Sequence, residues 1–174
     1  MCNFYQLVDY PGSKAAAFIG RKHFKSTVFT HGGRQWSILR RPNVTIGIGS
    51  GVYDRAVEFM KDVKHVFEGN EFFQWLYPEH AVLRPNAQPM WNDTQLVTPA
   101  RTRFRDQPTV KPFTVGGSTQ SLHFDILHMD DIIGDQQIDA FRHSTTEMHR
   151  VKNWLTSSVR TLVADWVRAQ IFVV

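Results

Sequence analysis

The sequence predicts an α/β fold built around a mostly parallel sheet. Short apolar runs alternate along the chain with longer segments whose apolar residues recur at helical spacing. Hydrophobic residues make up 42% and charged residues 21% of the 174 residues, as in an ordinary globular protein with a buried core. The sequence has no internal repeat and no low-complexity tract, so we expect one domain over residues 1–174.

Two strand–helix units are predicted in the first half of the chain. Residues 15–19 form an apolar run that we expect to be the first strand, leading through a basic loop into a helix over about 26–39. The sequence His-Gly-Gly at 31–33 interrupts the pattern of this helix. Residues 44–48 read as a second buried strand, and a helix with one apolar face follows over about 54–68.

The second half predicts further strands and one long helix. Strands are expected at 95–97 and 109–110, and an apolar strand at 124–129 is closed by two aspartates. Ser-Thr-Thr-Glu at 144–147 is a capping box, which predicts the start of a helix. The apolar residues of this helix recur at helical spacing and should share one face: Val151, Trp154, Leu155, Val159 and Leu162. A final apolar run at 171–174 reads as a strand inside a sheet.

Composition and termini exclude several classes of protein. No apolar stretch approaches the ~20 residues that a helix needs to cross a bilayer. Residues 1–5 lack the basic start and long apolar run of a secretory signal. Cys2 is the single cysteine, so no internal disulfide is expected and the setting is expected to be intracellular. The net charge of +4 permits contact with nucleic acid without requiring it.

A candidate phosphate-binding loop follows the first predicted strand. In such loops, backbone N–H groups at a helix start hold oxyanions, a lysine faces the β- and γ-phosphates, and a hydroxyl helps to ligate magnesium. Lys25 and Ser26 fit these roles, although Ile19 and Phe24 stand where the usual pattern has glycine. A basic strand-to-helix turn without a ligand is the alternative. The candidate nucleotide-binding residues are Gly20, Arg21, Lys22, His23, Phe24, Lys25, Ser26 and Thr27.

The second candidate motif is the pair Asp130 and Asp131 at the end of the strand at 124–129. Ligands of open α/β sheets gather at the carboxyl ends of strands. Asp130 would hold magnesium, directly or through water, together with Ser26. Asp131 would point the other way and polarise an attacking water. Two solvated aspartates in a turn are the alternative, but the two motifs together favour ATP and Mg²⁺ as cofactors.

The two motifs, in this order, resemble those of a known family. The chain is similar to the ATPase portion of the large subunit of a tailed-phage terminase, the DNA-packaging motor. Terminases have variant loops in which the glycines drift, commonly with an arginine four residues before the lysine, and Arg21 occupies that place. The resemblance implies a P-loop NTPase-type fold, a three-layer αβα sandwich. It is carried by residues 21–27, 43–50 and the helix that follows, 64–78, 90–93, 116–117 and 123–133.

The resemblance also implies a role for individual residues. Lys25 and Ser26 would bind phosphate and magnesium, and Arg21 would reach the γ-phosphate and stabilise charge in the transition state. Asp130 would be the Walker B acid, which ligates magnesium. Asp131 stands where the family has its catalytic acid, most often the longer glutamate.

Partners and location follow from the same resemblance. It implies double-stranded DNA, the terminase small subunit and the portal protein as partners, assembly as a homo-oligomer on the portal, and the host cell cytoplasm without a membrane. The family's Gly-Thr coupling motif would begin after Val174, and its nuclease domain would come later still. We therefore expect residues 1–174 to be a single ATPase domain that is incomplete at its C-terminus.

A basic segment adds a candidate DNA contact. Arg101, Arg103 and Arg105 alternate along the chain, which would place them on one face of an extended segment that follows a DNA backbone. A solvated hairpin is the alternative. Two other functions also stay open for the whole chain: a catalytically incomplete remnant that binds DNA or a partner, and another helicase-like P-loop ATPase.

Overall fold

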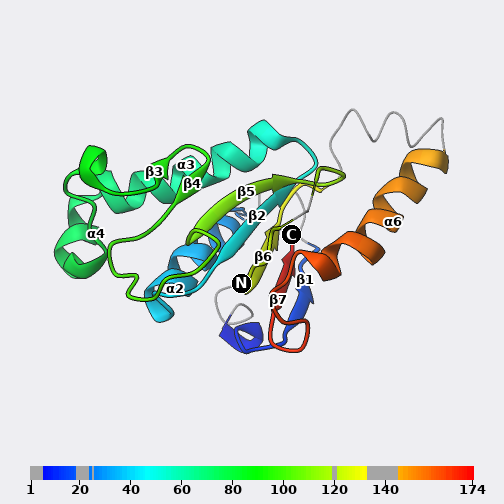
Figure 1. The fold of residues 1–174 in the computed structure, drawn as a ribbon, viewed down its shortest axis with the longest axis horizontal. Coiled ribbons are helices and arrows are strands. Elements are labelled where there is room, and N and C mark those ends of the chain that lie inside the picture. The colour runs from blue at the N-terminus through cyan, green and yellow to red at the C-terminus, as the bar shows by residue number, and fades with distance from the viewer. Residues whose placement is uncertain (1–5, 19–23, 25, 119–120, 133–144) are drawn as a thin grey trace.

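Figure 1 shows a computed structural model of the protein, which describes residues 6–18, 24, 26–118, 121–132 and 145–174. Within these residues, the strands are β1 (Lys14–Ala16), β2 (Ile46–Ser50), β3 (Trp91–Asn92), β4 (Gln95–Leu96), β5 (Val110–Thr114), β6 (Ile126–Met129) and β7 (Gln170–Val173). The helices are η1 (Ser26–Gly32), α2 (Gly33–Arg40), α3 (Tyr53–Gly69), α4 (Glu71–Leu76), η2 (Pro78–His80), η3 (Pro85–Ala87) and α6 (Thr145–Thr161).

The described strands form one seven-stranded sheet in the order β1-β7-β6-β2-β5-β4-β3. The five strands from β1 to β5 in this order are parallel to one another, β4 is antiparallel to β5, and β3 is antiparallel to β4. Ile46 of β2 is paired with Val110 of β5 on one side and with Ile126 of β6 on the other. The three central strands therefore begin at the same level of the sheet. The predicted mixed α/β fold with a mostly parallel sheet is confirmed.

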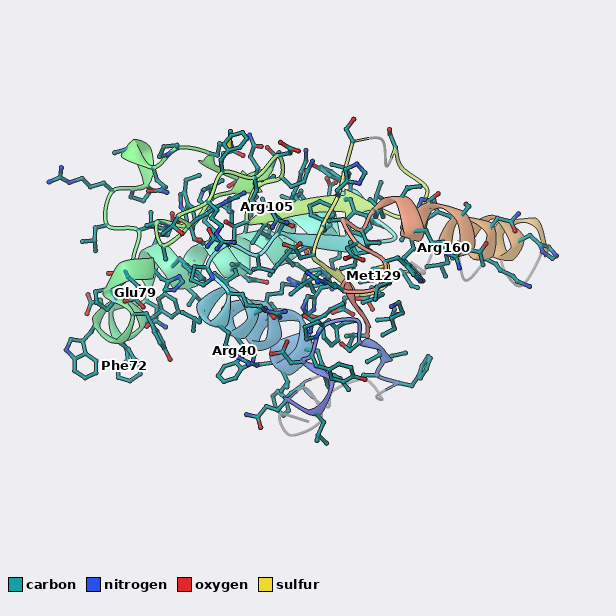
Figure 2. All side chains as sticks on the ribbon, turned by 60° about the horizontal axis from the view of Figure 1, so that its bottom comes forward. Arg40, Phe72, Glu79, Arg105, Met129 and Arg160 are labelled. Atoms are coloured by element: carbon teal, nitrogen blue, oxygen red, sulfur yellow. The ribbon has the colours of Figure 1, made fainter. Side chains whose placement is uncertain are left out.

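Helices cover both faces of this sheet. On one face, Ile46 and Ile48 of β2 pack in a single core with Met60 and Val63 of α3. Alternate residues of the neighbouring strands point to the other face, where Leu127 and Met129 pack with α6. The arrangement is compatible with a three-layer αβα sandwich. Figure 1 also places α4 and α6 at opposite ends of the molecule, and Phe72 and Arg160 mark these ends in Figure 2.

The apolar face predicted for the long C-terminal helix is confirmed. Val151, Trp154 and Val159 of α6 are buried, and Leu162 directly after the helix is buried as well. The ring of Trp154 stacks on Phe113 of β5 with 6.2 Å between centroids. An apolar stripe at helical spacing therefore located the side of α6 that meets the sheet.

The strand bounds differ from the prediction by about two residues. The second strand, expected at 44–48, is found at Ile46–Ser50, because its pairing with β5 continues as far as Thr114. Gly49 permits this packing, since a Cβ there would lie 2.4 Å from the ring of Phe113. The first strand is described at Lys14–Ala16, and residue 19 of the expected strand lies outside the described residues.

Candidate nucleotide site

The two predicted motifs lie at the same edge of the sheet. β1 and β6 are both parallel to β7, so the loop after β1 and the aspartates after β6 follow the carboxyl ends of strands. Of the loop itself, the structure describes Phe24, Thr27 and the backbone of Ser26, where helix η1 begins. The other predicted loop residues, Gly20, Arg21, Lys22, His23 and Lys25, lie outside the described residues.

Phe24 has the backbone conformation of a glycine. Its φ of 55° is in the left-handed region, which side chains other than glycine rarely adopt. Its carbonyl accepts a hydrogen bond from the Val28 amide at 3.0 Å, so Phe24 lies where the loop turns into the helix. The position that carries the second glycine in the usual loop pattern therefore needs the same unusual φ here.

Asp130 is buried at the end of β6 and is joined to the helix that follows the loop. Its amide donates to the Gly49 carbonyl at 3.0 Å, which extends the pairing with β2 by one residue. Its Oδ2 accepts a hydrogen bond from Thr30 Oγ1 at 2.5 Å. The sequence analysis did not predict a role for Thr30, because Thr30 lies outside the loop motif. Its spacing of four residues from Ser26 could have indicated one, since residues four apart lie on the same side of a helix.

Asp131 differs from Asp130 in both exposure and conformation. Its side chain is exposed and its φ of 48° is again left-handed, a conformation that aspartate tolerates better than most residues. The Asp131 carbonyl accepts hydrogen bonds from the Gly51 amide at 3.0 Å and from Ser50 Oγ at 3.3 Å. The turn of the backbone separates the exposed carboxylate from the buried one and fixes Asp131 against the end of β2.

Two basic side chains, Arg34 and His31, lie on the helices that follow the loop. Arg34 of α2 is fully buried, donates from Nη1 to the Phe59 carbonyl at 3.2 Å, and lies 5.3 Å from the Phe59 ring. His31 of η1 lies 3.2 Å from the Asp62 carboxylate. Burial lowers the pKa of His31, as Arg34 also does, whereas the charges of Asp62 and Asp130 raise it. The interior beside Asp130 is therefore strongly charged.

His128 occupies an unusual place inside β6. It is buried, and its ring stacks on Phe172 of β7 with 4.9 Å between centroids. Burial lowers the pKa of His128 well below its usual value, and the positive charges of Arg34 and Arg41 lower it further. The neutral imidazole therefore packs as an aromatic ring in a strand that is otherwise apolar.

An open hollow of about 480 Å³ lies between η1 and α3. Arg55 of α3 borders it and lies 2.8 Å from Glu58. The pKa of Arg55 is raised by its hydrogen bond to Glu58, and by the charges of Asp131 and Asp130. No motif in the sequence pointed to Arg55. The hollow is lined by His31, Arg55, Glu58, Phe59, Lys61 and Asp62.

The oxygen atoms at the end of β6 suit magnesium. Within the described residues, no group of three or more His, Cys, Asp or Glu side chains is placed to hold a metal ion. Magnesium does not need such a cage, because it usually keeps several waters and takes one or two carboxylates plus substrate phosphates. The carboxylate of Asp130 and the adjacent hydroxyl of Thr30 are hard oxygen ligands of this kind.

The three arginines of the basic segment are not on a strand and make different contacts, although all three border one open hollow of about 610 Å³. Residues 101–108 bend, and Arg101 turns inward to donate from Nη2 to the Gln107 carbonyl at 2.8 Å. Arg105 Nη2 lies 2.7 Å from Asp125 Oδ1 (Figure 2 labels Arg105). Arg103 is exposed, while Asn43 Oδ1 accepts a hydrogen bond from its amide at 2.7 Å. Local hydrogen bonds outweigh strand alternation here.

Comparison with known proteins assigns no family to the chain. No family model matches it, and a search of curated proteins finds no match. Within the described residues, no helix combines the length and apolar character needed to cross a membrane.

Proposed function

We propose that this chain binds and hydrolyses ATP, as the motor portion of a DNA-packaging protein similar to the terminase large subunits. The observation that carries the proposal is the hydrogen bond from Thr30 to Asp130. It joins the helix that follows the basic loop to the acid that ends β6, at the sheet edge where α/β proteins bind ligands. The finer fold assignment, a P-loop NTPase, belongs to the same proposal.

The spacing of the strands supports a triphosphate at this edge. β7 lies between β1 and β6, so the carboxyl ends of β1 and β6 are two strand spacings, or about 10 Å, apart. Phosphates would bind the loop backbone and Lys25, at the start of the helix, where N–H groups and the helix dipole favour anions. Asp130, oriented by Thr30, and Ser26 would hold Mg²⁺, which neutralises phosphate charge when bound.

Asp131 is the proposed proton acceptor for hydrolysis. The oxygen of a water would attack the γ-phosphorus, the bond from that phosphorus to the β–γ bridging oxygen would break, and ADP and phosphate would leave. Asp131 would orient the water and take its proton, because its carboxylate is exposed beside the buried Asp130. Arg21 is proposed to stabilise charge on the γ-phosphate.

Nucleotide binding and turnover test this proposal directly. The parent protein should bind a fluorescent ATP analogue and release phosphate from ATP in the presence of Mg²⁺. Lys25→Ala should lose binding and Asp130→Asn should lose turnover. Lys152→Ala and Asp106→Asn, which remove exposed charges elsewhere, should change neither. If neither the parent nor any variant binds nucleotide, the proposal is wrong. Binding without turnover would favour the catalytically incomplete remnant.

DNA is the proposed macromolecular partner, with Arg103 as the side chain offered to it. The basic segment precedes β5 and therefore lies at the amino edge of the parallel strands, opposite the nucleotide site. Arg103 borders a hollow of about 440 Å³ together with Arg41 and Arg168. Small-subunit and portal partners, and assembly as a homo-oligomer, remain proposals that rest on the resemblance.

A further inference from the structure

Arg55 stands at the start of α3, directly after the carboxyl end of β2. Its guanidinium is about half exposed and is paired with Glu58, one helical turn further along, at 2.8 Å. The guanidinium also lies 5.5 Å from the centroid of the Phe59 ring. An exposed pair of this kind contributes little to stability, so Arg55 can exchange its partner at small cost.

The backbone holds Arg55 close to the two aspartates. The Gly51 amide and Ser50 Oγ both donate to the Asp131 carbonyl, so the end of β2 is fixed against the turn that carries Asp131. Helix α3 begins two residues after Gly51, and Arg55 lies in its first turn. The hydrogen bond to Glu58 raises the pKa of Arg55 most, and the negative charges of Asp131 and Asp130 raise it further.

The other charged groups around the hollow are already matched. Asp62 pairs with His31 at 3.2 Å, and Lys61 lies 3.6 Å from the carboxylate of Asp93. Burial lowers the pKa of His31, so this imidazole is a weak source of positive charge at neutral pH. Arg55 is therefore the positively charged residue of this hollow that pairs with an exposed carboxylate of its own helix, that of Glu58.

We infer that Arg55 is a further cation, in addition to Arg21 and Lys25, that meets the terminal phosphoryl group of the bound nucleoside triphosphate. To do so, its guanidinium exchanges Glu58 for the phosphate oxygens. This inference rests on the proposed function. As the attacking water forms its bond to the γ-phosphorus and the bond to the bridging oxygen breaks, negative charge spreads over the equatorial oxygens. The planar guanidinium donates two parallel hydrogen bonds to such oxygens, while the proton of the water goes to Asp131.

Substitution of Arg55 tests the inference on the full chain. Arg55→Ala should lower kcat for ATP by about 10²-fold or more, because a donor aimed at developing charge acts mainly in the transition state. ATP affinity should change by no more than about 3-fold for the same reason. Arg55→Lys should restore only part of the rate, since an ammonium cannot form the paired bonds. Arg84→Ala, which removes another exposed arginine, is the matched control and should leave kcat unchanged.

Binding of a transition-state mimic tests the inference even if the protein binds ATP but does not hydrolyse it. The parent should bind ADP with aluminium fluoride more tightly than ADP alone, and Arg55→Ala should lose most of this preference. Arg55→Ala with unchanged kcat, or with the parent's preference for the mimic, overturns the inference while ATP binding stands. A binding-competent parent that shows no preference for the mimic also overturns it. If the parent binds no nucleotide, the proposed function and the inference fall together.

Discussion

Phe24 and Asp131 show how single residues at this edge adopt conformations that most side chains avoid. Both have φ near +50°, and both lie where the chain leaves a regular element or enters one. At Phe24 the side chain is 72% exposed, so little packing offsets the unfavourable backbone. Backbone strain of this kind is frequent at ligand sites, where the surrounding structure maintains it.

We expect Phe24→Gly to stabilise the protein. Glycine would remove a left-handed strain of about 1–2 kcal/mol, but would add about 0.5–1 kcal/mol of chain entropy to the unfolded state. The net gain in the free energy of unfolding, measured in urea, should reach about 1 kcal/mol. Phe104→Gly is the control, because Phe104 is also exposed but has no positive φ. A less stable Phe24→Gly protein would contradict the role given to this backbone conformation.

A second residue-scale prediction concerns the hydroxyl of Thr30. Thr30→Val keeps the shape of the side chain and removes its hydrogen bond to a buried carboxylate. The free energy of unfolding should fall by about 1.5–3 kcal/mol, and Mg²⁺-dependent affinity for ATP should fall as Asp130 loses its orientation. Thr156→Val, at an exposed position of α6 whose hydroxyl bonds only within its own helix, should change neither quantity. Equal effects of the two substitutions in denaturation and binding assays would refute this assignment.

At the scale of elements, the segment before β5 shows how hydrogen bonds divide apparently equivalent residues. Arg105 pairs with Asp125, which also accepts a hydrogen bond from the Thr45 amide at 2.9 Å. Arg101 donates to the backbone of its own segment. Arg105 thus ties the loop to the residue before β6, Arg101 holds the bend of the loop itself, and Arg103 is displayed to solvent. The anchored loop gives the exposed guanidinium a defined position at the amino edge.

Matched substitutions in this loop should separate DNA binding from stability. Arg103→Gln should weaken DNA binding to a similar degree for all sequences and reduce the slope of log K against log salt by about 1. It should leave the free energy of unfolding unchanged. Arg105→Gln should lower that free energy by about 1–2 kcal/mol, because it removes a charge-assisted bond from Asp125. Fluorescence anisotropy at several salt concentrations, with urea denaturation, measures both effects. The reverse pattern would exclude Arg103 as the DNA contact.

At the scale of the whole molecule, Asp9 ties three distant parts of the chain together. Its buried carboxylate accepts hydrogen bonds from Arg40 Nη1 at 2.7 Å, Arg41 Nη2 at 2.9 Å and Trp36 Nε1 at 3.0 Å. Gln170, at the start of β7, donates to it as well at 3.2 Å. Asp9 therefore links the N-terminal segment to α2 and to β7.

Asp9→Ala should be strongly destabilising. The substitution removes a buried carboxylate that two partly exposed arginines share, and the loss of its charge-assisted hydrogen bonds should cost about 1.5–3 kcal/mol. Urea denaturation should show this loss, whereas Asp106→Ala, at an exposed carboxylate, should stay within about 0.5 kcal/mol of the parent. A loss below about 1 kcal/mol for Asp9→Ala would mean that this network does not hold the fold together.

Local patterns in the sequence were sufficient for much of the fold. The apolar faces of α3 and α6 and the apolar run that became β6 repeat at short, regular spacing, so helices and strands could be located within a few residues. The bend of the segment at 101–105 could not be predicted, because its hydrogen bonds to Asp125 and Asn43 involve residues far along the chain. The spacing of residues along the chain carries no information about such distant partners.

The candidate site divides in the same way. The sequence by itself determined that a basic loop enters a helix and that Asp130 and Asp131 follow a buried strand, because these features depend on neighbouring residues. Only the tertiary structure decided that Thr30 meets Asp130 and that Arg55 reaches the same edge. Both contacts depend on strand order, with β7 between β1 and β6 and β2 beyond, and that order is set by packing between segments far apart in the chain.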